Sequence, residues 1–469
     1  MNRKMNFIFA LVVASLLSLG ALAQQPEAPK KQAPPAGSAP RPFTVPPSQT
    51  FSLPNGLQAT LVPYGNVPKA TIIVTVRAGA LNEPADQVWI SDFTGRLIKE
   101  GGTKTKSANQ VAQEAASMGG AVDVTAGPDR TQLSSDVLSE LTPKMVALLA
   151  DLATHPALPD SEMPRLKQDS LRNLSIEKSR PQPLARERFM KTLYPDHPYG
   201  RIYPTEEMIQ KYTGDDVRKF YASNFGAART HVYVAGKFDP DAVKQAITAA
   251  FSSWPKGPDV LVNPPKAASK RTLELIDRPN AAQSTLYIGL PTVDPSNPDY
   301  LPLQVMNTLL GGSFGSRITS NIREQKGYTY SPFGQLSARY RSAYWAEIAD
   351  VTTAVTGASI KEILFEVNRL QKEAPSAEEL KGIQDYMAGV FVLQNSSRFG
   401  IIGQLANVDL HGLGPDYLKN YVQNVYAVTP ERVQQLAEKY LDTDKMTIVV
   451  VGDKSKIGDQ IAPYQPSGQ

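Results

Sequence analysis

The sequence predicts an α+β fold of two homologous domains, each a mainly antiparallel sheet with helices on one side. Three observations lead to this fold class. Short apolar runs alternate with longer amphipathic stretches, one segment is repeated at a fixed offset, and a proline-rich stretch lies near the middle of the chain. Strands followed by runs of helices in each copy favour an antiparallel-rich sheet with its helices segregated from it.

The repeat relates residues 213–236 to residues 429–452 without a gap, at an offset of 216 positions. The matching positions are Thr213, Val217, Phe220, Phe225, Val232, Val234 and Gly236 in the first copy, and Thr429, Val433, Leu436, Leu441, Ile448, Val450 and Gly452 in the second. Each copy predicts a helix followed by a short strand that ends in glycine. This match indicates a duplicated α+β domain.

Other elements follow from strand and capping signals. The runs 70–76 and 284–290 predict equivalent strands early in each half, each followed by a helix start that contains a proline, at Pro84 and Pro298. Ser107-Ala-Asn-Gln110 is a capping box that predicts a helix start.

Periodicity predicts the remaining long elements. Alternating runs near 121–126 and 130–137 are typical of strands, and helical spacing over 356–373 and 376–397 predicts two long helices.

The N-terminus has the pattern of a cleaved secretory signal: Arg3 and Lys4, an apolar run over 7–19, and the small-x-small site Ala21-Leu22-Ala23. An uncleaved anchor is the alternative, but about thirteen apolar residues are too few to span a bilayer comfortably. We therefore expect residues 1–23 to be a signal peptide, and the mature protein to be periplasmic or secreted without a stable membrane anchor.

The remaining boundaries follow from proline-rich stretches. Residues 24–48 cannot bury enough apolar surface to offset their ordering entropy and predict an extended tether. A second stretch around Pro258 and Pro264 predicts a linker. The predicted domains are residues 49–258 and 269–469, joined by a linker at 259–268.

Charge and cysteine content exclude several classes of protein. The chain has 49 Lys and Arg against 45 Asp and Glu, and this excess lies in the first 48 residues. The nearly neutral body argues against a nucleic-acid partner. There is no cysteine, so neither a disulfide nor a thiolate metal ligand is available.

The segment Phe51-Ser-Leu-Pro-Asn-Gly-Leu57 and a later Glu100-Gly-Gly-Thr103 resemble the first domain of the insulinase/pitrilysin (inverzincin) family of zinc metallopeptidases. Active members have H-x-x-E-H on the helix just before the Gly-Thr. The two histidines share one helical face and bind zinc, the glutamate polarises the attacking water, and a glutamate on a later helix completes the site.

This chain lacks those residues. Counted back from Gly102-Thr103, the two histidine positions and the glutamate position of the motif fall on Phe93, Leu97 and Arg96. The third-ligand position falls on Asn173, both by the usual family spacing and by counting back from the segment 194–200. The four histidines lie far apart in the sequence, at 155, 197, 231 and 411. We expect no metal in this chain.

The second half contains Leu309-Leu-Gly-Gly-Ser-Phe-Gly-Ser-Arg-Ile-Thr-Ser-Asn-Ile-Arg-Glu-Gln-Lys-Gly-Tyr-Thr-Tyr330, which resembles the non-zinc half of the family. There an arginine at a helix end precedes a tyrosine by seven residues, matching Arg323 and Tyr330. The resemblance implies that Arg323 holds the substrate backbone and that Tyr330 donates to the oxyanion at the scissile carbonyl. Tyr328, expected on the same strand face, is the alternative.

Two other interpretations of this segment stay open. An arginine near a helix C-terminus can simply stabilise the helix dipole, and a strand tyrosine is usually a packing residue. The glycine run 311–315 has no G-K-[ST] and is predicted as a turn between helices rather than a phosphate loop.

The resemblance covers residues 49 to about 460, and full-length members use twice as many such domains. It therefore implies a zinc-less subunit of an exported heterodimeric metallopeptidase. The zinc would belong to a separate partner carrying H-x-x-E-H, and Arg323 and Tyr330 would complete its peptide-hydrolysing site in trans. The alternative is a purely structural or peptide-binding pseudo-peptidase subunit. The sequence identifies neither the partner nor the peptide.

Overall fold

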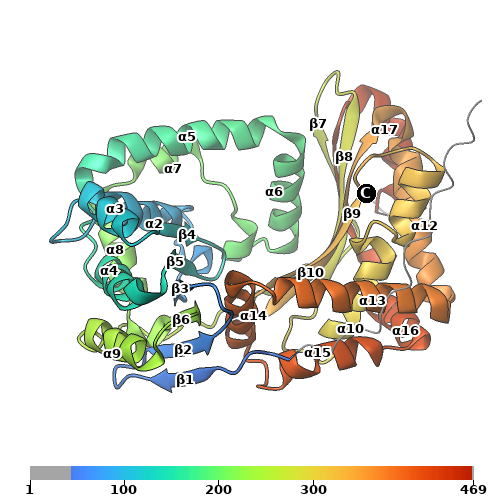
Figure 1. Cartoon of the computed structure of the whole chain (residues 1–469). Coiled ribbons are helices and arrows are strands. Elements are labelled where there is room, and N and C mark those ends of the chain that lie inside the picture. Colours follow the sequence, from blue (N-terminus) through green and yellow to red (C-terminus); the bar gives the residue numbers. More distant parts are fainter. Residues whose placement is uncertain (1–43, 467–469) are drawn as a thin grey trace, which may run out of the picture. The chain divides into compact units, whose positions relative to one another are not determined.

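The computed structural model describes residues 44–466 of the 469-residue chain (Figure 1). The predicted signal peptide and residues 24–43 of the predicted tether lie outside the described residues. Residues 44–48 have no regular secondary structure and lead directly into the first strand. Within the described part, no helix combines the length and the apolar character that crossing a membrane requires.

The first half forms a six-stranded sheet with the order β1-β2-β6-β3-β5-β4. The strands are β1 (Gln49–Ser52), β2 (Gln58–Pro63), β3 (Lys69–Val76), β4 (Asp123–Ala126), β5 (Thr131–Leu138) and β6 (Thr230–Gly236). All neighbours are antiparallel except β2 and β6. The predicted alternating strands near 121–126 and 130–137 are confirmed as β4 and β5.

The helices of the first half are α2 (Ile90–Gly101), α3 (Ala108–Ser117), α4 (Thr142–Thr154), α5 (Met163–Ser179), α6 (Pro181–Leu193), α7 (Glu206–Lys211), α8 (Gly214–Asn224) and α9 (Pro240–Phe251). The predicted capping box is confirmed: Ser107 accepts from the Gln110 amide, and Gln110 accepts from the Ser107 amide at 2.8 Å.

The predicted helix start at Pro84 is wrong, because α2 begins at Ile90. The Glu83 carboxylate accepts the backbone N–H groups of Trp89 and Ser91, each at 3.0 Å. These two bonds satisfy free donors at the true helix start, which Pro84 precedes by a turn.

The second half forms a five-stranded sheet with the order β7-β11-β8-β10-β9. The strands are β7 (Thr272–Asp277), β8 (Gln283–Thr292), β9 (Phe333–Arg339), β10 (Ser342–Thr352) and β11 (Thr447–Gly452). Only β7 and β11 are parallel. The predicted linker at 259–268 lies between α9 and β7, in a stretch without helix or strand.

The helices of the second half are α10 (Tyr300–Asn307), η6 (Thr308–Gly312), α11 (Arg317–Thr319), η7 (Ser320–Gln325), α12 (Thr356–Lys372), α13 (Ala377–Gln394), α14 (Arg398–His411), α15 (Tyr417–Tyr426), α16 (Pro430–Tyr440) and α17 (Lys454–Ile461). Segments η6 and η7 have π-helical hydrogen bonding. The two long helices predicted by periodicity are confirmed as α12 and α13.

The duplication is visible in the topology. The repeat copies are α8–β6 in the first half and α16–β11 in the second. Strand β3 lies between β6 and β5, as β8 lies between β11 and β10, and the single parallel pair has the same place in both sheets. The predicted fold class, two homologous α+β domains with mainly antiparallel sheets, is confirmed.

Each sheet packs its own helices on one face, and the opposite face receives a helix from the other half. Ile401, Ile402 and Ala406 of α14 pack on the first sheet at Ile73 and Tyr233.

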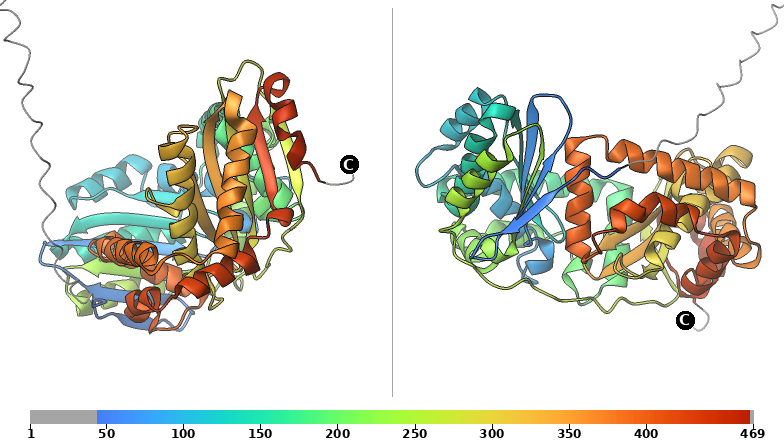
Figure 2. Two further views of the ribbon diagram at one scale, coloured as in Figure 1. Left: turned by 90° about the vertical axis from the view of Figure 1, so that its right-hand side faces the viewer. Right: turned by 60° about the horizontal axis from the view of Figure 1, so that its bottom comes forward.

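In the same way, α6 of the first half packs on the second sheet. Ala185, Phe189 and Met190 of this helix contact Tyr287 and Val449. Figure 1 shows α6 beside the second sheet, and Figure 2 shows α14 against the first. Helices α6 and α14 are related by the repeat offset, so the exchange is reciprocal.

Candidate functional site

Helix α2 holds the positions where active relatives of the suspected family would place their histidines. Phe93 and Leu97 are fully buried in the core of the first half. The Phe93 ring packs edge-on against Tyr212, with ring centroids 5.3 Å apart. Both side chains are therefore hydrophobic core groups rather than site residues.

Arg96 points instead toward α5. Its Nη2 lies 3.1 Å from Asp169 Oδ2, and its Nη1 donates to Ser170 Oγ at 3.3 Å. Asn173 lies one helical turn after these two residues, on the same side of α5. The structure thus brings the helix of the degenerate motif beside the helix that holds the predicted third-ligand position.

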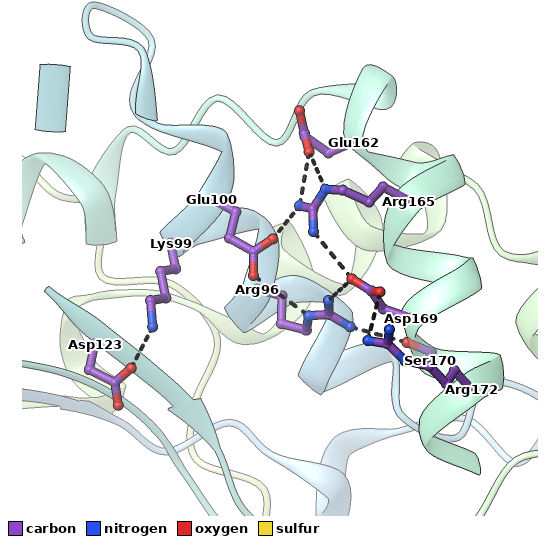
Figure 3. Close-up of polar contacts among 9 residues, drawn as sticks. All are labelled: Arg96, Lys99, Glu100, Asp123, Glu162, Arg165, Asp169, Ser170 and Arg172. Carbon is purple, nitrogen blue, oxygen red and sulfur yellow. Dashed lines mark hydrogen bonds and ion pairs between the residues drawn. The ribbon is translucent and has the colours of Figure 1, made fainter. Parts of the chain in front are cut away.

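The contact between α2 and α5 is an ion-pair network (Figure 3). Asp169 binds Arg96, Arg165 at 3.3 Å and Arg172 at 3.1 Å. Arg165 also binds Glu100 and, at 2.9 Å, Glu162, and these hydrogen bonds raise the pKa of its guanidinium.

The positive charges of three guanidinium groups and the negative charges of three carboxylates therefore compensate one another at this contact. Arg165 and Arg172 are largely exposed, so water screens their pairs, whereas Arg96 is the more sheltered member.

The residues at this contact do not fit zinc. Among residues 44–466, no group of three or more His, Cys, Asp or Glu side chains is arranged to hold a metal ion. A fixed guanidinium at position 96 adds a repulsive charge for any cation. The contact between α2 and α5 therefore offers no suitable set of ligands for a metal ion.

Three of the four histidines have separate local polar partners. His155 contacts Asp151 and Thr154, His197 contacts the Asn263 carbonyl, and His231 contacts Thr60 and Asp409. His411 is buried, and desolvation lowers its pKa to about 4. None of them faces the contact between α2 and α5.

Arg323 and Tyr330 lie together on the second half. The Arg323 guanidinium carbon is 4.8 Å from the centroid of the Tyr330 ring and 4.4 Å from that of Phe314. Its Nε also lies 3.0 Å from Glu324 Oε1. Tyr330 is 78% exposed, so its hydroxyl is presented to solvent beside a positive charge.

Tyr328 is placed differently. Its side chain packs against the core of the second half, and its N–H donates to the Ile322 carbonyl at 2.8 Å. The expectation that Tyr328 and Tyr330 share one strand face is wrong, since β9 begins only at Phe333 and Thr329 makes an isolated bridge to Val351. The helix end holds Tyr328 inward, and the exposed Tyr330 is the partner of Arg323.

Local sequence explains how Arg323 is positioned. Helix η7 ends where Gly327 adopts a left-handed φ of 63°, and its N–H donates to the Arg323 carbonyl at 3.1 Å. The turn predicted over residues 311–315 is confirmed only for residues 313–315, because Gly311 and Gly312 are the last residues of η6. At Gly311 a Cβ would overlap the buried Glu347 carboxylate.

A cavity of about 470 Å³ lies between α2, α5 and the second sheet. From the first half it is lined by Trp89, Asp92, Ser170 and Asn173, and from the second by Tyr287, Gln335, Ser337, Arg339 and Tyr344. The strand residues were not recognised in the sequence, because only the packing of the two halves brings them to Asn173. The lining offers donors and acceptors for a polar chain.

Acidic groups at the rim of this cavity are partly desolvated. Burial raises the pKa of Glu83 to about 7, against the opposing effect of its bonds to Ser91 and Trp89. Burial also raises the pKa of Asp92, and the nearby Arg96 opposes this shift. Both groups line the cavity of about 470 Å³.

Comparison with protein families gives two adjacent matches. Residues 61–204 match the family described as insulinase (peptidase family M16), and residues 211–387 match the peptidase M16 inactive domain. Together the matches cover more than half of the chain.

Individual proteins agree with these matches. An uncharacterized zinc protease of Bacillus subtilis, YmxG, is 24% identical over 84% of this chain and 96% of its own length. A solved peptidase M16 inactive domain from Pseudomonas fluorescens has a TM-score of 0.79 at 24% identity, covering 87% of this chain and 98% of that one. A protease from Helicobacter pylori has a TM-score of 0.81 at 20% identity, over 87% and 100%.

Proposed function

The chain belongs to the insulinase family (peptidase family M16) as a member without the zinc motif, and we propose that it is the zinc-less subunit of a heterodimeric metallopeptidase. The partner is a separate chain that has H-x-x-E-H and binds the zinc. The present chain closes the peptide chamber and supplies Arg323 and Tyr330 to the partner's site.

The exposed Arg323–Tyr330 pair is the observation that supports this role most. Tyr330 is 78% exposed, with the Arg323 guanidinium carbon 4.8 Å from the centroid of its ring, so the pair is not part of the core of its own chain. Peptide hydrolysis develops negative charge on the carbonyl oxygen, and a hydroxyl donor aimed at that oxygen stabilises the transition state. The guanidinium can hold a peptide carbonyl before and after that step.

The proposed zinc-binding partner follows from the absence of the zinc motif on α2. With Phe93 and Leu97 in the core and Arg96 paired to Asp169, these three positions of α2 offer no group that activates water. An incoming peptide therefore needs its nucleophile from another subunit, and the substrate class is unfolded peptide.

Substitution at Tyr330 in the complex tests the role directly. Tyr330→Phe removes one hydroxyl and keeps the ring, so assembly should be unchanged while turnover falls about 10²–10³-fold, the usual loss for one oxyanion donor. Arg323→Ala should mainly raise KM, because its contact exists in the ground state. The measurement is peptide cleavage by the complex co-purified from the native host.

Tyr328→Phe is the matched control, since Tyr328 packs against the core two residues away. A fully active Tyr330→Phe complex together with an impaired Tyr328→Phe complex would show that the tyrosine role belongs to Tyr328. If neither substitution matters while the partner still requires this chain, the subunit acts without a catalytic contribution.

We also propose that the chain works after export, in the periplasm or outside the cell, as the sequence Ala21-Leu22-Ala23 after an apolar run suggests. The intact mass of the protein from the exported fraction should correspond to a chain that begins at Gln24. A mass that includes residues 1–23 would contradict processing.

A purely structural or peptide-binding subunit is the second candidate. The cavity of about 470 Å³ beside Asn173 favours it, because a polar lining from both halves can hold a peptide without any chemistry. Unchanged peptide binding after Tyr330→Phe, with no effect on turnover, is the result this candidate requires.

A further inference from the structure

Three arginines flank neighbouring strands at one end of the first sheet. Arg77 follows the last residue of β3, whereas Arg130 and Arg229 directly precede β5 and β6. In the antiparallel register Val76 lies opposite both Thr131 and Thr230. The three arginines therefore occupy the next row across adjacent strands, where side chains share one face and like charges destabilise the sheet.

Among the described residues no carboxylate forms a direct ion pair with these arginines, and Asp129 and Asp259 act on Arg130 and Arg229 from beyond ion-pair distance. In the described part of the chain, no acidic oxygen lies within 4.0 Å of the side-chain nitrogens of Arg77, Arg130 or Arg229. Desolvation lowers the pKa of Arg130, and desolvation followed by the charge of Arg77 lowers that of Arg229. Sheltered guanidinium groups without a direct ion pair favour the binding of a counter-ion.

The three arginines have neutral partners only. Arg229 donates to the Pro258 carbonyl at 3.0 Å, and Arg130 Nη1 donates to the Ala406 carbonyl at 3.3 Å. The Arg77 guanidinium carbon lies 4.4 Å from the centroid of the Tyr340 ring. These contacts orient the three side chains but do not neutralise their positive charges.

All three line one cavity of about 230 Å³, which α14 covers with Ala406 and Asp409. Asp409 is the one acid among the described lining residues, so the arginines and Asp409 together give a net charge of +2. The cavity opens to solvent, because Asp409 and Gln58 are exposed.

Asp409 is engaged with other groups. Its carboxylate accepts from the Tyr233 hydroxyl and lies 3.2 Å from Nδ1 of His231. Desolvation lowers the pKa of His231 to about 4, against the opposing effect of Asp409, so this histidine is neutral near pH 7. The excess positive charge therefore persists at neutral pH.

We propose that this cavity binds a small oxyanion, namely a carboxylate or a phosphate group. A guanidinium group can donate two coplanar hydrogen bonds to two oxygens of such an anion. Several guanidinium groups from adjacent strands can bind the same anion. The volume accepts the charged group with a few attached atoms. The bound anion would join the first sheet to α14, independently of the Arg323–Tyr330 pair.

Titration of the purified full chain at constant ionic strength tests the site. Inorganic phosphate and a short peptide with a free C-terminal carboxylate are the probes, and the same peptide as its C-terminal amide distinguishes the two sources. We expect saturable binding of one anion per chain. Arg130→Gln should weaken that affinity at least tenfold, because the site loses one of its three guanidinium groups.

Arg172→Gln is the control, an arginine of α5 whose side chain is 70% exposed and lies outside the cavity. It should bind the probes as the natural chain does. Arg77→Gln provides a second variant with the same expected loss if Arg130→Gln does not fold. Absence of saturable binding of phosphate and of the carboxylate peptide to the natural chain, or equal affinity in both cavity variants, would overturn the proposal.

Discussion

Arg96 places a positive charge on α2 at the position where the sequence resemblance puts the glutamate that polarises zinc-bound water in active family members. Its guanidinium binds Asp169 and Ser170, so α2 and α5 are joined by ion pairs and hydrogen bonds. In active members zinc ligands come from the corresponding pair of helices. An arginine at this position thus serves the contact between the helices without a metal.

The substitution pattern of the motif could be read from the sequence, but the new partner of Arg96 could not. Asp169 is 73 residues away, and only the packing of α5 on α2 brings it within 3.1 Å. The family spacing gave Asn173 as the third-ligand position. No sequence motif indicated the ion pairs around Asp169. The family resemblance of the surrounding segment singled out Arg323 and Tyr330, which lie side by side in the structure, and their catalytic role stays a prediction.

Glu347 in the middle of β10 gives a pH prediction at the residue scale. The side chain is fully buried, and neither carboxylate oxygen has a hydrogen-bond partner among the described residues. Desolvation raises its pKa well above the ordinary value of 4.5. The folded state therefore keeps a proton that the unfolded chain releases, and the free energy of unfolding falls as pH rises above 4.5.

Glu347→Gln removes this titration. Between pH 5 and pH 8 the variant should gain stability relative to the natural chain, by up to about 1.4 kcal/mol per pH unit. Denaturant unfolding at several pH values measures the difference. Glu438→Gln, at an exposed position of α16, is the matched control. Parallel curves for Glu347→Gln and the natural chain would contradict a protonated Glu347.

At the scale of elements, helices α6 and α14 connect the halves by a reciprocal exchange. Phe189 of α6 is fully buried, with its ring centroid 4.5 Å from that of Tyr287 on β8 and 5.5 Å from that of Tyr344 on β10. The second sheet therefore depends on a helix of the first half for its second buried face.

Phe189→Ala tests this dependence. Loss of a buried phenylalanine costs about 3–5 kcal/mol, and the amides of β8 and β11 should lose protection from hydrogen exchange. Phe251→Ala is the matched control, because Phe251 lies in the separate core of the first half. It should lower protection there while leaving β8 and β11 closer to the natural chain. Unchanged exchange in β8 and β11 of Phe189→Ala would show that α6 does not stabilise the second sheet.

Elements with a local signal were predictable, and those fixed by distant contacts were not. The Ser107 capping box and the long helix α12 follow from short-range patterns. The start of α2 depends on Glu83 accepting two backbone N–H groups, which the proline at 84 obscured. Tyr330 lies outside a strand because the end of η7 turns the chain before β9 begins.

At the scale of the whole molecule, the duplicated fold and the absent metal motif are the two observations behind our proposal of a two-chain enzyme. The repeat at an offset of 216 residues predicted the duplication because α8–β6 and α16–β11 still share amino-acid sequence similarity. The exchange of α6 and α14 could not be predicted, since it is a relation between the two copies rather than within one.

Metal analysis of the purified chain shows whether this chain binds zinc by itself. After expression with zinc in the medium and mild dialysis, this chain should hold far less than one zinc per molecule, because Phe93, Leu97 and Asn173 offer no ligand set and Arg96 adds a repulsive charge. The complex with its partner should contain about one zinc per pair, bound by the partner. About one tightly held zinc per molecule of this chain alone would contradict the account.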